Sequence, residues 1–348
     1  MREAAVIRAQ GVDFDPKALH GFLEQFLRRP VPELTIRPTE GGMSNPTCFV
    51  DADGWRAVLR KQPPGPLAKS AHAIDREYRV MSALARSDVP VPRLYHYHED
   101  ANLLGTPFYL MEWLTGRVFT DYALPGIAPG ERAALYDAMC DTMARIHRLD
   151  YTALGLGDFG RPGNYFRRQL GRWSQLWQQY RKGDADNPDL DAMILWLDQR
   201  IPESEALTLC HGDFRIGNMM FHPTRPRVIG VLDWELSTLG HPLVDVGFNT
   251  QAWQMAADEN GGLLGRDLDA LGIPSEQTYL ARYYAGARSP EQMTDFHRVF
   301  AMFRGAVGSA GVAVRGERGN STLPDSVRVG RRLARAYAAR GMQLARAA

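Results

Sequence analysis

The pattern of apolar residues changes character once along this chain, near residue 115, and that change limits the folds it can adopt. Before it, short apolar runs end at Gly, Pro or Asp-Gly turns, as strands do. After it, apolar residues recur at the three- and four-residue spacing of helices. The sequence therefore predicts an α+β chain with a β-rich lobe over 1–114 and a helical lobe over 115–348.

The individual elements follow from the same patterns. In the first lobe we expect helices over 15–28 and 75–85 and strands over 34–39, 47–50, 55–61 and 107–114. In the second lobe we expect helices over 129–149, 164–181 and 190–200, short strands over 207–210, 219–221 and 228–232, and mainly helix after Pro242.

Composition sets few limits on function. The 348 residues carry a net charge of +1, which gives no reason to expect a nucleic acid or a membrane surface as partner. The arginines near the C-terminus are expected to form a solvated helix face. Cys48, Cys140 and Cys210 lie far apart and form no metal-binding spacing, and the first residues lack a signal-peptide core, so a reducing cytoplasm is expected.

The most informative segment is His211-Gly-Asp-Phe-Arg-Ile-Gly-Asn218, followed by a hairpin that ends at Asp233. Because a hairpin brings its ends together, Asn218 and Asp233 should be neighbours. Phosphoryl transfer from ATP needs a carboxylate for the proton of the attacking hydroxyl, and a carboxylate with an amide oxygen for Mg²⁺. The pattern therefore indicates an ATP- and Mg²⁺-dependent phosphotransferase.

Five motifs follow one another between Gly41 and Pro242, within a region of roughly residues 30–310 that is similar to one known family. They are Gly41-Gly-Met-Ser-Asn45, Val58-Leu-Arg-Lys61, Asp75-Arg-Glu-Tyr-Arg79, His211–Asn218 and Leu232-Asp-Trp-Glu-Leu-Ser-Thr-Leu-Gly-His-Pro242. Together they resemble the aminoglycoside phosphotransferase/choline kinase family, and within it a subgroup that includes kinase-like domains fused to acyl-CoA dehydrogenases. The resemblance implies a bilobal protein-kinase-like fold, with a small antiparallel sheet in the N-lobe and a mainly helical C-lobe.

The resemblance also implies catalytic roles at matching positions. Asp213 would be the base, Asn218 and Asp233 would hold Mg²⁺, and His211 would brace the loop. Asp245 would pin that loop through backbone hydrogen bonds. Arg215 either stabilises charge on the transferred phosphate or is a surface arginine, and both interpretations stay open.

The nucleotide would be held by the first lobe. Gly41, Gly42, Ser44 and Asn45 would cover the phosphates, although this turn departs from the Gly-x-Gly-x-x-Gly of protein kinases. Strand alternation puts Arg60 and Lys61 on opposite faces, and the register of the resembled family favours Arg60 for the phosphates, with Glu77 as its partner. Backbone groups of Glu112 and Leu114 in the hinge would contact adenine.

Three other interpretations compete with a kinase. Gly155-Leu-Gly-Asp-Phe-Gly160 matches a dinucleotide fingerprint but follows a helix, so we expect a loop. A catalytically silent nucleotide-binding scaffold would not need all of Asp213, Asn218 and Asp233. A metallohydrolase could use these six residues as ligands: His211, Asp213, His222, Asp233, His241 and Asp245. That last reading leaves Asn218 and the glycine turn unexplained.

The acceptor is expected to be a small molecule with a hydroxyl group. Only six residues separate Asp233 from Gly240, so no long segment is present to receive a polypeptide. Candidates for its pocket, which could equally be packing and surface residues, are Asn164, Tyr165, Arg168, Arg172 and Trp173. Arginines are frequent here and acidic residues are missing. This favours an anionic or neutral acceptor over a polycationic aminoglycoside, which is the alternative. The resemblance to domains fused to acyl-CoA dehydrogenases implies a hydroxyacyl-CoA as one candidate.

Overall fold

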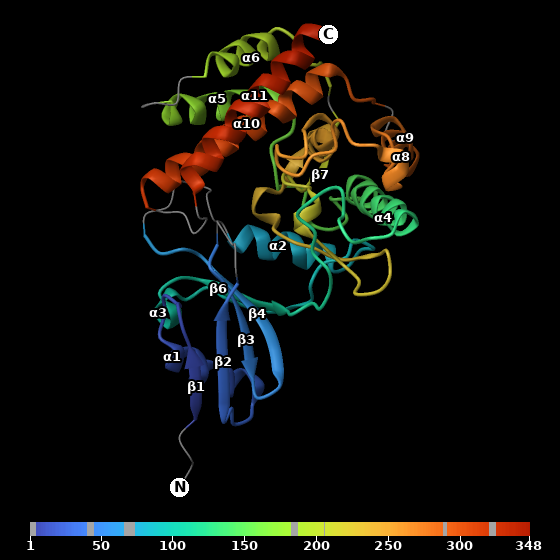
Figure 1. The fold of residues 1–348 in the computed structure, drawn as a ribbon. Helices are drawn as coiled ribbons and strands as arrows, with labels where there is room; N and C mark the ends of the chain where they lie inside the picture. Colours follow the sequence, from blue (N-terminus) through green and yellow to red (C-terminus); the bar gives the residue numbers. More distant parts are fainter. Residues whose placement is uncertain are drawn as a thin grey trace. The chain divides into compact units, whose positions relative to one another are not determined.

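The structure is a computed structural model that describes residues 5–39, 45–65, 74–181, 187–204, 206–287, 291–319 and 325–348. The chain divides into two compact units. The first comprises Met1–Arg86 with Val91–Thr115, and the second comprises Ser87–Pro90 with Gly116–Ala348. Each unit has its own apolar core, and Figure 1 shows their elements. The α+β class expected from the sequence is confirmed.

The first unit is built on a six-stranded sheet with the order β1-β2-β3-β4-β6-β5. Its strands are β1 (Val6–Ala9), β2 (Glu33–Pro38), β3 (Thr47–Ala52), β4 (Trp55–Lys61), β5 (Leu94–His98) and β6 (Phe108–Glu112). All neighbouring pairs are antiparallel except β1 and β2. The sheet is therefore mixed, where the sequence predicted an antiparallel one. The helix α1 (Pro16–Leu27) supplies the crossover that a parallel pair requires.

The β3–β4 hairpin turns at Asp53 and Gly54, which both have positive φ (50° and 82°). This backbone matches the right-handed twist of the flanking strands, which explains why Asp-Gly marks the turn. Along β3, alternate residues are buried against α1, where Leu19 and Leu23 face the sheet. Two further helices complete the unit: α2 (Ile74–Leu84) and α3 (Ala101–Leu104).

The second unit is mainly helical. Its helices are α4 (Pro129–His147), α5 (Tyr165–Tyr180), α6 (Pro188–Asp198), α7 (Leu243–Thr250), α8 (Leu268–Leu271), α9 (Glu276–Ala287), α10 (Asp295–Glu317) and α11 (Ser326–Ala347). Two small antiparallel ladders join β7 (Thr208–Cys210) to β10 (Thr238–Gly240), and β8 (Met219–Phe221) to β9 (Val228–Val231). Short 3₁₀ turns follow β7, β9 and α7: η1 (Ile216–Asn218), η2 (Trp234–Leu236) and η3 (Gln251–Gln254).

The longest helices, α10 and α11, lie side by side, drawn in orange to red in Figure 1. Small residues allow this close approach, because a Cβ at Gly330 would lie 2.7 Å from the backbone of α10. The core of this unit collects apolar side chains from α5, α6, α10 and α11. Cys48, Cys140 and Cys210 are free thiols and are buried. None of the helices in the described ranges is both long and apolar enough to span a membrane.

Candidate active site

The segment 211–218 forms a loop that leaves β7, passes through η1 and enters β8. Gly212 lies in this loop with φ +85°, and a Cβ there would come within 2.4 Å of the Leu236 carbonyl oxygen. Only glycine fits both the backbone angle and the close contact. The loop is therefore pressed against the chain that follows β9.

Asp245, in the first turn of α7, holds the start of this loop. The carboxylate is completely buried and accepts hydrogen bonds from the backbone N–H groups of His211 (2.6 Å) and Gly212 (2.8 Å). His147 of α4 approaches the same carboxylate through Nε2 at 3.3 Å. Burial alone would raise the pKa of Asp245. The hydrogen bond from His147, the nearby imidazoles and the Gly212 N–H together hold that pKa below its ordinary value.

His211 uses both ring nitrogens inside the loop. Nε2 lies 2.9 Å from the carbonyl oxygen of Leu232, and Nδ1 lies 3.1 Å from the backbone N–H of Asp213. A carbonyl can only accept and an N–H can only donate, so the ring is neutral with its hydrogen on Nε2. His211 therefore links the loop to the segment after β9 and has no nitrogen left for proton transfer.

Asp213 is positioned by two neighbours in the loop. The Asn218 Nδ2 group donates to the Asp213 carbonyl oxygen (2.9 Å) and to its Oδ2 (2.7 Å), and Arg215 Nε donates to the same Oδ2 (3.2 Å). Both side-chain donors converge on one oxygen of the carboxylate. The loop thus fixes the direction of the Asp213 carboxylate and directs the second oxygen away from these two donors.

Asn218 and Asp233 are brought together by the β8–β9 hairpin. Met219 pairs with Val231 in this ladder, and the backbone N–H of Leu232 donates to the Asn218 carbonyl oxygen at 2.8 Å. Asp233 follows with a left-handed backbone (φ 65°, ψ 59°), a conformation that aspartate tolerates better than most residues. The Asn218 amide nitrogen is engaged with Asp213, which leaves its amide oxygen for another ligand. Asn218 and Asp233 thus offer the all-oxygen donor set that Mg²⁺ prefers.

The six residues of the metallohydrolase interpretation do not gather as ligands. His211 is engaged as described above, His222 lies beside Thr224, and His241 lies between Ser204 and Glu291. Within the described ranges, a different trio places ligand-type atoms within 4.8 Å of one another: His147, Cys210 and Asp245. Burial, with Asp245 nearby, raises the pKa of the Cys210 thiol well above its ordinary value, so the thiol stays protonated. Asp245, with His147 beside it, thus forms a clamp on the start of the loop, and Cys210 lies next to them in β7.

In the first unit, Arg60 and Lys61 point to opposite faces of β4, as alternation requires. Arg60 Nε lies 3.0 Å from Oε2 of Glu77, whose side chain is 1% exposed on α2. Lys61, also 1% exposed, pairs with Asp13 at 3.0 Å and lies over the ring of Phe14. The two cations therefore have separate carboxylate partners on separate faces.

The other predicted nucleotide contacts are placed only in part. Gly41, Gly42 and Ser44 lie outside the described residues, and Asn45 is buried. The Glu112 backbone N–H donates to the Arg93 carbonyl oxygen at 2.7 Å, and the Glu112 carboxylate accepts from the Arg93 N–H. A backbone contact from Glu112 to a ligand would therefore use its carbonyl oxygen. Leu114 follows the end of β6.

The predicted acceptor residues lie just before α5 and along it as far as its middle. Asn164 has a left-handed backbone just before the helix, and Tyr165 is buried against Gly240. Arg168 donates to the carbonyl oxygens of Arg161 and Pro162, and Arg172 is exposed. Trp173 faces the guanidinium of Arg304, a residue of α10 that sequence reasoning missed. His147 was missed as well, because nothing in a helical pattern shows that its last residue reaches Asp245.

Comparison with known proteins places these features in a family. A profile of the phosphotransferase enzyme family matches residues 35–271. Acyl-CoA dehydrogenase family member 10 of Mus musculus is 40% identical over 285 residues, which is 81% of this chain. The match spans only 26% of that much longer relative.

Two solved structures are similar to the whole chain. A putative aminoglycoside phosphotransferase from Ralstonia eutropha is 40% identical, with a TM-score of 0.83, and the match covers 96% of this chain and 99% of that one. An aminoglycoside phosphotransferase in a ternary complex with ADP and hygromycin B has a TM-score of 0.60 at 14% identity, covering 94% and 98% of the two chains, and shares the fold. The motifs, the fold and the matches agree: this chain belongs to the phosphotransferase enzyme family.

Proposed function

We propose that the chain transfers the γ-phosphate of ATP, with Mg²⁺, to a hydroxyl group of a small molecule. The observation that carries the proposal is the loop in which Asn218 and Arg215 orient the Asp213 carboxylate while Asp245 holds the backbone. A catalytically silent nucleotide-binding scaffold would not need a carboxylate oriented in this way. The ADP complex of a protein with the same fold adds support for a nucleotide substrate.

Asp213 would act as the base of the reaction. Its Oδ2 is held by Asn218 and Arg215, so the other oxygen would accept the proton of the attacking hydroxyl. The new bond joins the acceptor oxygen to the γ-phosphorus, while the bond from that phosphorus to the oxygen of the leaving ADP breaks. Arg215, beside Asp213, would stabilise negative charge on the transferred group.

Asn218 and Asp233 would hold Mg²⁺ through oxygen atoms, and the bound ion would neutralise charge on the nucleotide phosphates. Arg60 would contact the α- and β-phosphates, because Glu77 fixes its guanidinium on one face of β4 while Lys61 is committed to Asp13. Gly41, Gly42, Ser44 and Asn45 would cover the phosphates. The Glu112 carbonyl and the Leu114 backbone would contact adenine.

The acceptor would be an anionic or neutral hydroxylated metabolite, such as a hydroxyacyl-CoA. The helix α5 carries three arginines and no acidic residue, which disfavours a polycationic aminoglycoside. The name of the mouse relative, an acyl-CoA dehydrogenase family member, is compatible with an acyl-CoA acceptor. An aminoglycoside kinase remains the second candidate because the family includes such enzymes.

The test is calorimetric titration of ATP with and without Mg²⁺ into the wild-type chain, the Asp233→Ala variant and the Asp258→Ala variant. Asp258 is an exposed carboxylate of the same unit and serves as the matched control. We expect Mg²⁺-dependent binding that Asp233→Ala abolishes and Asp258→Ala preserves. ADP release with a panel of hydroxyacyl-CoAs, sugars and aminoglycosides then identifies the acceptor. Absence of nucleotide binding to the wild type would contradict the proposal.

A further inference from the structure

A buried arginine lies directly behind the candidate catalytic loop. Arg304, in the middle of α10, is 7% exposed, and its Nη2 donates to the Gly212 carbonyl oxygen at 2.6 Å. Its guanidinium carbon lies 5.4 Å from the ring centre of Trp173 and 5.2 Å from that of Phe248. Both aromatic side chains are only half-buried. Elements α5, α7 and α10 thus build an aromatic-lined cation site one residue from Asp213.

No carboxylate of the described residues neutralises the charge of Arg304. Over the described parts of the chain, its Nε and Nη1 are buried without a hydrogen-bond partner, and no carboxylate lies within 4.0 Å of its guanidinium. Arginine keeps its proton at any ordinary pH, so this charge cannot be relieved by titration. Two aromatic faces attract the cation but offer its N–H groups no acceptor. Burying a charge without a counter-ion raises the free energy of the folded chain, and a bound anionic ligand would offset this cost.

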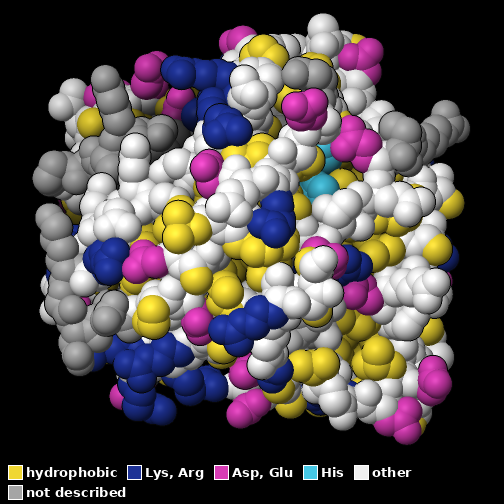
Figure 2. Space-filling view, turned by 90° about the horizontal axis from the view of Figure 1, so that it is seen from above, with side chains coloured by type: hydrophobic (Ala, Val, Ile, Leu, Met, Phe, Trp, Pro, Cys, Tyr) yellow, Lys and Arg dark blue, Asp and Glu magenta, His cyan; other side chains and the backbone are white. Residues whose placement is uncertain are grey.

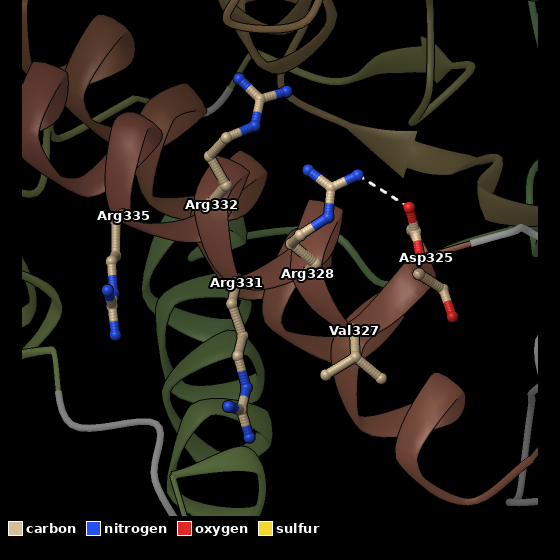
Figure 3. A pocket seen from close by; sticks show the side chains of 7 residues that line it. Asp325, Val327, Arg328, Arg331, Arg332 and Arg335 are labelled. Carbon is tan, nitrogen blue, oxygen red and sulfur yellow. Dashed lines mark hydrogen bonds and ion pairs between the residues drawn. The ribbon is translucent and has the colours of Figure 1, made fainter.

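Other arginines of the same unit contrast with it. Arg298, two turns earlier on α10, pairs with Glu276 at 3.1 Å. In the exposed pocket at the start of α11, Arg328 pairs with Asp325 at 2.7 Å (Figure 3). Arg331 of the same pocket pairs with Glu317, also at 2.7 Å. On the face drawn in Figure 2, basic side chains likewise form separate groups with acidic side chains nearby. Arg304 is more deeply buried than these three arginines, yet it has no carboxylate partner among the described residues.

We propose that Arg304 binds an oxyanion of the acceptor, a carboxylate or a phosphate, and so selects hydroxylated molecules that carry negative charge. This rests on the proposed phosphotransferase function. The bond to Gly212 fixes the guanidinium behind the peptide that precedes Asp213, so an anion held by Arg304 would place a hydroxyl of the same molecule near the base. Trp173 and Phe248 would pack against the adjoining carbon chain. A polycation would be repelled from this position.

The first test uses wild-type protein loaded with MgADP and matched pairs of alcohols. The carboxylate pair is 3-hydroxybutyrate and 3-hydroxybutyramide, and the phosphate pair is 3-hydroxybutyryl-CoA and the corresponding pantetheine thioester. Inorganic phosphate is a third probe. We expect the anionic member of at least one pair to bind ten-fold or more tightly than its neutral partner, and the pair that responds identifies the oxyanion. Equal binding of both members in both pairs, or no binding of any anion, would overturn the proposal.

The second test compares Arg304→Met and Arg304→Lys with Arg315→Met, an exposed arginine on the same helix. Arg304→Met should raise the KM of the anionic acceptor ten-fold or more while KM for the neutral partner stays unchanged, and lysine should restore part of the difference. A role confined to bracing Gly212 would instead lower kcat equally for both partners, which contradicts the proposal. Arg315→Met should keep the wild-type preference.

The two levels of failure are distinguishable. If the wild type binds no MgATP, the phosphotransferase proposal itself fails. If MgATP binds but anionic and neutral acceptors behave alike, only the role of Arg304 fails. Should Arg304→Met not fold, the wild-type pairs and the lysine variant still decide.

Discussion

The two units differ in whether their buried charged side chains have partners of opposite charge. In the sheet unit, the cations of β4 each face a carboxylate: Arg60 faces Glu77 and Lys61 faces Asp13. In the helical unit, the buried carboxylate of Asp245 is satisfied by backbone N–H groups and one imidazole, and buried Arg304 has no carboxylate partner in the described residues. Charges that are paired within the protein stabilise the local structure whether or not a ligand is present. An unpaired buried charge is neutralised only when a ligand of opposite charge binds.

The largest effect on stability is expected at Asp245. Asp245→Ala leaves the N–H groups of His211 and Gly212 buried without an acceptor, which should lower the free energy of unfolding by about 3–5 kcal/mol. Asp245→Asn retains one acceptor oxygen and should lose less. Urea unfolding followed by circular dichroism measures both variants, with Asp258→Ala as control. A loss below about 1 kcal/mol in the alanine variant would show that the clamp does not hold the loop.

The second prediction concerns the paired charges of the sheet unit. Arg60→Met removes the cation that lies 3.0 Å from the buried Glu77 carboxylate and should cost about 3 kcal/mol of unfolding free energy. The double variant Arg60→Met with Glu77→Leu should recover most of that loss, since no charge is then buried. Arg56→Met removes an exposed partner of Asp51 and should cost less than about 1 kcal/mol. A double variant no more stable than the single one would contradict the pairing.

The third effect appears as pH dependence. His297 is buried on α10, and burial, with the charges of His241 and Arg298, lowers its pKa from 6.5 to about 3. The unfolded chain therefore takes up a proton below pH 6.5 that the folded chain refuses, so stability falls as pH drops from 6.5 toward 3. The loss should reach about 2 kcal/mol at pH 5. His297→Gln should flatten the profile, measured as melting temperature against pH.

The smallest effect is expected at the unpaired cation. Arg304→Met loses the hydrogen bond to Gly212 but removes a buried charge that has no counter-ion, so the free energy of unfolding should change by only about 1 kcal/mol. Thermal unfolding beside Arg60→Met measures the difference between the two arginines. Destabilisation as large as that of Arg60→Met would mean that Arg304 already has an anionic partner in the folded chain.

Most of the fold could be predicted because apolar spacing reflects burial. The strand predicted over 55–61 matches β4, and the helix over 15–28 brackets α1 (Pro16–Leu27). The sequence did not reveal β1, β5 or β10. β1 and β10 are only four and three residues long, and β5 (Leu94-Tyr-His-Tyr-His98) lacks an apolar alternation because all its residues are half-buried. Missing β1 also concealed the parallel edge of the sheet.

The candidate site likewise contains residues that the sequence predicted and one that it did not. Asp213, Asn218 and Asp233 were found because a loop and a hairpin bring them together over short sequence distances, and the roles assigned to them remain proposals. Arg304 could not be found from sequence. Its surroundings depend on how Trp173, Phe248 and α10 pack together. Local sequence patterns do not predict such tertiary packing.

The clamp at Asp245 determines how the catalytic loop behaves when the protein is heated. Asp245 belongs to α7, and nearly every residue of that short helix is buried in the helical unit. A loop anchored in this way has no independent melting transition, unlike active-site loops that fray well below the temperature at which the domain unfolds. The geometry of Asp213 should persist until the helical core itself melts. Inactivation and loss of helical structure should then occur at the same temperature, and returning the sample to a lower temperature should not reveal a folded but catalytically disordered form.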